Sequence, residues 1–162
     1  YRWETGTASF ETIAGVGACI DYIAGLGEAY GAEHASEFAG FTGRKLDLKT
    51  GMAAAGAYER ELATHLIDVL QRQPGVTIAG ITDPDRYKDR VPTVVFALDS
   101  HTPEQIATHL ANHSIYVWDG NYYAVEIMNR LGRTQHGMVR VGLAHYNTDE
   151  EIDRFESVLK LL

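Results

Sequence analysis

Residues 138–151 read Met-Val-Arg-Val-Gly-Leu-Ala-His-Tyr-Asn-Thr-Asp-Glu-Glu, and this stretch decides the fold of the second half of the chain. Its apolar first part predicts a strand from Met138 to Leu143. Thr148 and Glu151 form a capping box, a pair whose side chains bond to backbone amides at the start of a helix. The stretch therefore predicts a strand, a turn and a terminal helix.

The residues before this stretch alternate between strand and helix signals. Thr102 and Gln105 form a second capping box, with proline at the first helical position. In chain order, we predict strands at 76–79 and 91–98, a helix at 102–112, a strand at 115–118 and a helix at 123–131. The predicted fold class is α/β, an α+β small domain in which helices cover one face of a small, mainly antiparallel sheet.

The first half of the chain is helical in pattern. Apolar residues recur at helical spacing within 9–26, and Cys19 is predicted to be a small core residue of that helix. Residues 28–48 contain several glycines and predict a loop with one helical turn near 35–38. A second helix is predicted over 48–72, with one apolar stripe. That stripe consists of Tyr58, Leu62, Leu66 and Val69.

Composition excludes several classes of partner. The chain has 14 Lys+Arg against 22 Asp+Glu, a formal net charge of −8. No basic stripe is available to neutralise phosphates, so neither a nucleic acid nor a membrane surface is expected as a partner. No apolar run reaches the roughly 18–20 residues needed to cross a bilayer, so no membrane-spanning helix is expected. A single cysteine is typical of a reducing environment, which predicts a cytoplasmic location.

Arg140 lies in the middle of an otherwise apolar strand, where an unpaired guanidinium is costly. It could form a salt bridge with a nearby Asp or Glu, or it could bind the carboxylate of a ligand at two points. Spacing alone leaves both explanations open.

Two other groups of residues could carry chemistry. His109 and His113 have a spacing that can chelate zinc on a helix, but no third ligand follows in a suitable pattern, so no metal site is expected. Asp119, Asn121 and the tyrosine pair at 122–123 follow a predicted strand, and such clusters occur both in pockets and in surface turns.

Three stretches of the chain resemble class V aminotransferases, the fold-type-I pyridoxal-phosphate enzymes that include cysteine desulfurases. The first is Arg2-Trp3-Glu4-Thr5-Gly6-Thr7 with the helix that follows, and the second is Tyr58-Glu59 with its helix and Pro74-Gly75-Val76. The third and most specific is Val139-Arg140-Val141-Gly142 with the Tyr146-Asn147-Thr148 turn. The resemblance implies three parts: the tail of a large domain over 1–47, an interdomain helix over 48–75, and a C-terminal small domain over 76–162.

The resemblance also implies roles for individual residues. Arg140 would bind the α-carboxylate of an amino-acid substrate, and Tyr123 and Asn121 would lie on the substrate side of the site. Thr7 would lie near the phosphate of pyridoxal 5'-phosphate, in this family usually that of the neighbouring subunit, which implies a homodimer.

The chain departs from the family pattern in three ways. Tyr123 stands where desulfurases carry their sulfur-accepting cysteine, and Trp118 replaces a common arginine. None of the four lysines has the setting of the lysine that binds the cofactor. We therefore expect a transaminase or a lyase rather than a desulfurase of the usual covalent route, and a fragment without turnover on its own. The alternatives are a stand-alone module that binds a small anionic ligand or regulates another protein, and an interaction domain without such a site.

Overall fold

The computed structural model describes residue 3 and residues 5–162, which form two compact units. One unit ends at Ala57, and the other is Tyr58–Leu162. Helix α2 (Arg44–Arg72) contributes to both. Arg2 and Glu4 of the first resembling stretch lie outside the described residues. The predicted division at residues 47/48 and 75/76 stays a prediction.

The first unit is helical almost throughout. It contains α1 (Phe10–Tyr30), the 3-10 helix η1 (Ala32–Phe38) and the first part of α2. The predicted loop over 28–48 is wrong at its two ends, which belong to α1 and α2, whereas the helical turn predicted near 35–38 lies within η1. Gly31 lies against Thr50 of α2, where a Cβ atom would come within 2.4 Å of the threonine hydroxyl.

Helix α1 presents a largely exposed surface in the part of the chain that the structure describes. Ile13 and Val16 are 59% and 55% exposed, and Cys19 is also exposed, so the interpretation of Cys19 as a core residue is wrong here. By length and composition α1 could also cross a membrane, which corrects the expectation that no run is long enough. The buried core helix of a soluble protein and a signal sequence near an N-terminus pass the same test.

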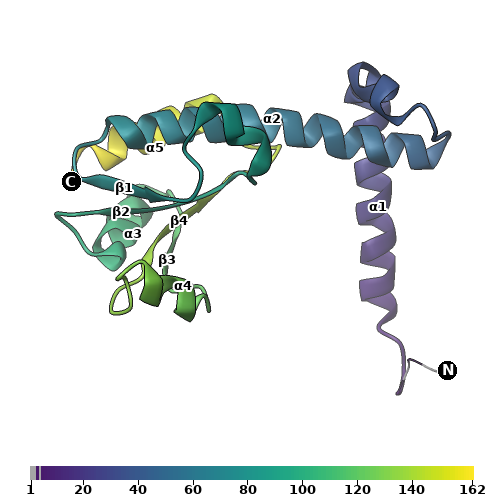
Figure 1. Ribbon diagram of the computed structural model, residues 1–162. Helices are drawn as coiled ribbons and strands as arrows, with labels where there is room; N and C mark the ends of the chain where they lie inside the picture. Colours follow the sequence, from purple (N-terminus) through teal and green to yellow (C-terminus); the bar gives the residue numbers. More distant parts are fainter. Residues whose placement is uncertain (1–2, 4) are drawn as a thin grey trace. The chain divides into compact units, whose positions relative to one another are not determined.

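The second unit is built on a four-stranded sheet (Figure 1). Its strands are β1 (Val76–Ala79), β2 (Thr93–Leu98), β3 (Trp118–Gly120) and β4 (Met138–Gly142). They lie in the order β1-β2-β4-β3, and each neighbouring pair is antiparallel. The 3-10 helix η2 (Pro84–Asp89) lies between β1 and β2. The predicted α/β class with a small antiparallel sheet is confirmed.

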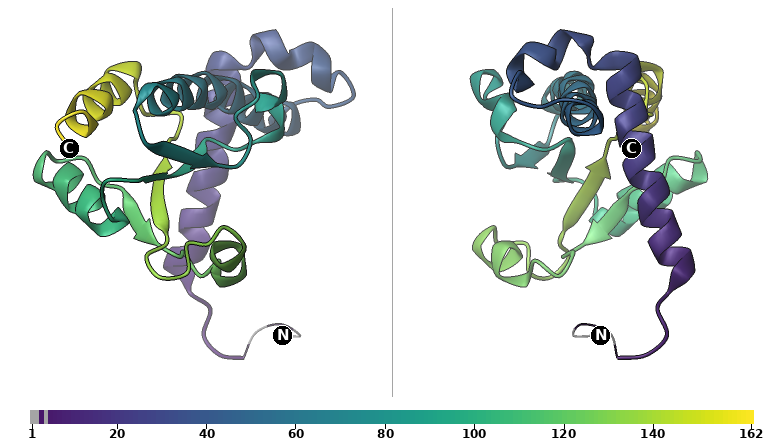
Figure 2. Two further views of the ribbon diagram at one scale, coloured as in Figure 1. Left: turned by 60° about the vertical axis from the view of Figure 1, so that its left-hand side comes forward. Right: turned by 90° about the vertical axis from the view of Figure 1, so that its right-hand side faces the viewer.

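Three helices cover one face of this sheet, as predicted: α2, α3 (Pro103–Asn112) and α5 (Asp149–Leu159) (Figures 1 and 2). Phe96 of β2 packs edge-on against Phe155 of α5 at 6.2 Å between ring centroids. Both predicted capping boxes are present at the starts of α3 and α5. The short helix α4 (Val125–Arg130) lies on the other face, where Met128 packs against Ala97 and Met138.

The strand predicted at 115–118 is displaced. The apolar run predicts a strand from Ile115 onward, but pairing with β4 begins only at Trp118, opposite Arg140. At the other end of β3, Gly137 permits a close backbone approach, because a Cβ atom there would lie 2.0 Å from the carbonyl oxygen of Gly120. The two backbones therefore touch at the end of β3, and that contact is not visible in the local pattern.

Candidate functional site

Arg140 points to the face of the sheet opposite the three long helices. Its neighbours Val139 and Val141 are buried in the main core, and side chains alternate between the two faces of a strand. Val95 of β2 and Trp118 of β3 lie beside Arg140 in the register of the sheet. The arginine is half-buried, so its guanidinium is partly accessible.

The guanidinium of Arg140 contacts two aromatic rings. Its central carbon lies 5.2 Å from the ring centroid of Trp118 and 4.9 Å from that of Tyr122. Such contacts stabilise a cation while leaving its N–H groups available at the edge. Arg140 forms no ion pair or hydrogen bond with any of residues 3 and 5–162, so a salt bridge to a nearby Asp or Glu does not explain it within this range.

Tyr122 is fixed in place by its hydroxyl group. The hydroxyl lies within hydrogen-bonding distance of two backbone carbonyl oxygens, that of Met138 and, at 3.2 Å, that of Trp118. Burial raises the pKa of this phenol; the nearby Arg140 lowers it and Asp119 raises it, and the net direction is upward. Tyr122 therefore stays neutral at ordinary pH and keeps the proton that it donates.

The loop after β3 has an unusual backbone. Tyr122 and Tyr123 have φ angles of 53° and 61°, in the left-handed region that residues with side chains rarely occupy. The side-chain oxygen of Asn121 accepts a bond from the amide of Tyr123 at 3.0 Å. Strained residues of this kind persist only where the surroundings hold them, and they concentrate at functional sites.

The predicted substrate residues Asn121 and Tyr123 thus lie in the loop that also carries Tyr122. The side chain of Asn121 already bonds to the backbone, and Tyr123 is 97% exposed. Their contact with a substrate stays a prediction.

The Tyr146-Asn147-Thr148 turn holds the end of β4 rather than supplying reactive groups. The hydroxyl of Tyr58 donates to the carbonyl of Asn147 at 2.8 Å, and the side-chain oxygen of Asn147 accepts from the amide of Ala144 at 2.8 Å. Glu59 accepts a bond from the amide of His145 at 3.1 Å. These bonds connect α2 to the turn that follows the arginine strand.

The two histidines considered as metal ligands are used within the fold. His109 donates from Nε2 to the carbonyl of Val158 at 3.0 Å, and His113 donates from Nδ1 to the carbonyl of His109 at 2.9 Å. The first bond connects α3 to α5, so these imidazoles have a structural role.

The residues considered for a cofactor come from both units. Thr7 is exposed and belongs to the first unit, so its predicted contact with a phosphate stays untested. Lys45 and Lys49 lie over the ring of Phe41, and Lys160 pairs with Glu156 at 2.9 Å. Neither unit by itself forms, among the described residues, a site that fits pyridoxal phosphate.

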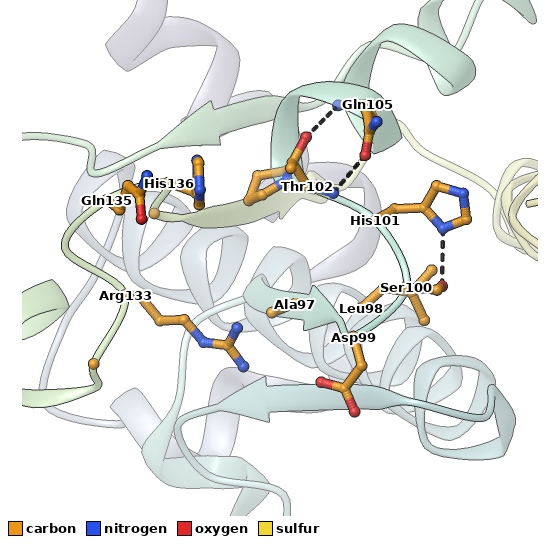
Figure 3. A pocket seen from close by; sticks show the side chains of 13 residues that line it. Ala97, Leu98, Asp99, Ser100, His101, Thr102, Gln105, Arg133, Gln135 and His136 are labelled. Atoms are coloured by element: carbon orange, nitrogen blue, oxygen red, sulfur yellow. Dashed lines mark hydrogen bonds between the residues drawn. The ribbon is translucent and has the colours of Figure 1, made fainter.

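A separate pocket of about 340 Å³ lies between the end of β2, the start of α3 and the loop before β4 (Figure 3). The side chain of Arg133 extends into it towards Ala97 and Asp99 (Figure 3). Neither Arg140 nor the two rings that contact it line this pocket.

Sequence reasoning identified the arginine but missed its aromatic neighbours. Trp118 and Tyr122 lie on either side of the short Asp119-Gly120-Asn121 turn, and this pair of aromatic residues is the signal that the sequence offers.

Comparisons with known proteins give a consistent result. The profile of the Aminotransferase class-V family matches residues 43–155. The chain is 33% identical over 112 residues to the aminotransferase-like protein FGM3 of Gibberella zeae, covering 67% of this chain and 27% of that protein. It is 29% identical over 154 residues to a cysteine desulfurase of Salmonella agona, covering 95% of this chain and 30% of the relative.

Solved structures agree with this result. An apo cysteine desulfurase from Thermococcus onnurineus is 26% identical, with a TM-score of 0.56 over 72% of this chain and 30% of that one. The cysteine desulfurase CsdA from Escherichia coli, 22% identical, shares the fold with a TM-score of 0.58 over 72% of this chain and 29% of that one. The chain thus spans less than a third of the length of these relatives. Because the family profile matches well over half of its residues, the chain belongs to the class V aminotransferase family.

Proposed function

We propose that this chain is the C-terminal region of a pyridoxal-phosphate enzyme that acts on an amino acid, and that Arg140 binds the substrate's α-carboxylate. The observation that carries the proposal is the arginine itself. Its guanidinium is half-buried, lies against two rings and has no acidic partner among the described residues. A carboxylate that binds both N–H groups along one edge would satisfy it.

The remaining catalytic groups would come from residues beyond these 162. Pyridoxal phosphate, when bound, stabilises negative charge at the carbon next to the substrate's amino group. Arg140 would orient that carbon by holding the carboxylate beside it. Turnover by this chain alone is not expected, because it offers no lysine in a suitable setting. We also propose a homodimer and a cytoplasmic location for the whole protein.

The first test is spectroscopic. The full-length protein should show the long-wavelength absorbance of a protein-bound pyridoxal cofactor, and adding a reactive amino acid should change that absorbance. Amino-acid amides serve as controls, since they lack the carboxylate that Arg140 would hold. A full-length protein that binds small anions but never the cofactor would instead support the stand-alone binding module.

The second prediction concerns sulfur. Tyr123 occupies the expected place of the desulfurase cysteine, and a phenol cannot hold a persulfide. After incubation with cysteine, mass spectrometry of the full-length protein should therefore detect no added sulfur on residues 118–131. The Tyr123→Cys variant is the informative comparison, because it restores the missing thiol. A persulfide on the unmodified protein that disappears in Cys19→Ser would show that the exposed Cys19 has taken over the role, contrary to this account.

A further inference from the structure

We propose that Trp118 and Tyr122 are positioning residues that hold the guanidinium plane of Arg140, so that a ligand's carboxylate can approach only along its edge. This inference rests on the proposed function, because it assumes that Arg140 binds a carboxylate. It adds two residues that come from the strand and loop beside β4.

The first step is geometric. Both rings lie close to the guanidinium carbon, at 5.2 Å and 4.9 Å from their centroids, within the range of cation–π contact. Trp118 is the direct partner of Arg140 in the β3–β4 register, so the sheet itself places its ring beside the arginine. An arginine side chain otherwise has many rotamers, and these contacts restrict them before any ligand arrives.

The second step is the anchoring of Tyr122. Its hydroxyl donates to the backbone carbonyl of Met138 in β4, with that of Trp118 in β3 also within reach, so the ring cannot swing away from Arg140 without breaking that bond. The left-handed backbone at Tyr122 and Tyr123 turns the chain sharply after Gly120, and the Gly120–Gly137 contact holds the start of that turn. The strained loop therefore places the ring of Tyr122 against Arg140.

The third step concerns the N–H groups of Arg140 that the two rings leave available for hydrogen bonding. A planar guanidinium donates hydrogen bonds only along its N–H edges, and an edge that the two rings leave open matches the two oxygens of a carboxylate. Trp118 is 60% exposed, so part of its ring is accessible to a ligand that binds Arg140. The predicted ligand class is therefore a compound with a planar carboxylate, bound at two points.

Binding measurements on the full-length protein test this arrangement. Calorimetry would compare L-alanine with L-alaninamide for the parent protein, Trp118→Leu and Trp118→Phe. We expect Trp118→Leu to weaken L-alanine binding by roughly 3- to 30-fold, because a cation–π contact and the order it imposes are lost. Trp118→Phe should restore most of the affinity, and amide binding should hardly change. Tyr116→Leu is the matched control, since Tyr116 is 83% exposed and has no ring contact with Arg140.

A second measurement needs no ligand. In protein labelled with nitrogen-15 arginine, the guanidinium protons of Arg140 should resonate at lower frequency than those of other arginines, because they lie near ring faces. This displacement should shrink in Trp118→Leu and change in Tyr122→Phe, which keeps the ring but loses its anchor. Assignment follows from the signal that disappears in Arg140→Lys.

The two proposals fail in different ways. Unchanged L-alanine affinity in Arg140→Ala would remove the proposed function. A large loss in Arg140→Ala together with no loss in Trp118→Leu and undisplaced Arg140 protons would overturn only the positioning role.

Discussion

Replacing Arg140 by alanine in the full-length protein is expected to weaken binding of an amino-acid substrate by about 100-fold or more, because two charge-assisted hydrogen bonds to the carboxylate are lost. Arg140→Lys should recover part of this loss, since a lysine keeps the charge but not the two-point geometry. Binding would be measured by titration of the cofactor absorbance and, independently, by calorimetry.

Arg86→Ala is a suitable control for this experiment. Arg86 lies in η2, is mostly exposed and pairs locally with Asp89 at 3.3 Å. Its removal should leave substrate affinity unchanged. Equal affinity in the parent protein and in Arg140→Ala would mean that the carboxylate is bound by other residues.

The second large effect concerns stability of the first unit. In Gly27→Ala, the new Cβ would lie 1.8 Å from the carbonyl oxygen of Asp47, which is backbone and cannot rotate away. We expect the variant to be destabilised by about 3 kcal/mol, the upper range for overpacking, measured as a lower midpoint of thermal unfolding. Gly51→Ala should behave similarly, because its Cβ would lie 2.3 Å from the carbonyl oxygen of Ile23.

The Gly25→Ala variant separates the effect of the close contact on stability from the effect of helix propensity. Gly25 lies in α1 like Gly27, but no atom from outside its own helix lies within 4 Å of the Cβ that it would gain. Alanine is favoured over glycine in helices by about 1 kcal/mol, so this variant should be neutral or more stable. If Gly25→Ala and Gly27→Ala had the same midpoint of thermal unfolding, the close contact of α1 and α2 would not exist in the folded protein.

Local signals in the sequence were sufficient to predict where α3 and α5 begin and that the sheet is small and antiparallel. The capping boxes at Thr102 and Thr148 each span four residues, so they can be identified from the sequence alone. Helices α3 and α5 begin directly after them. Gly31 lies within the predicted loop, and its role could not be predicted because it depends on a contact with Thr50 of another helix. The close approach of Gly137 to Gly120 at the end of β3 is likewise a contact between residues distant in the sequence.

The difference between local signals and distant contacts also applies to the candidate site. Arg140 could be recognised from the residues around it, because a charge within an apolar strand is unusual. Its partners could not be, since Trp118 and Tyr122 reach it only through the pairing of β3 with β4 and the strained loop after β3. The exposed apolar face of α1 poses a related problem: its pattern indicates burial, but nothing within the described residues covers Ile13 or Val16.

The most direct test of the central claim is a crystal structure of the full-length protein with a non-reactive amino-acid analogue. The account predicts both carboxylate oxygens at about 3 Å from the guanidinium nitrogens of Arg140, with the rings of Trp118 and Tyr122 still against it. It would be contradicted by an Arg140 paired with an acidic residue of the protein while the analogue's carboxylate is bound elsewhere.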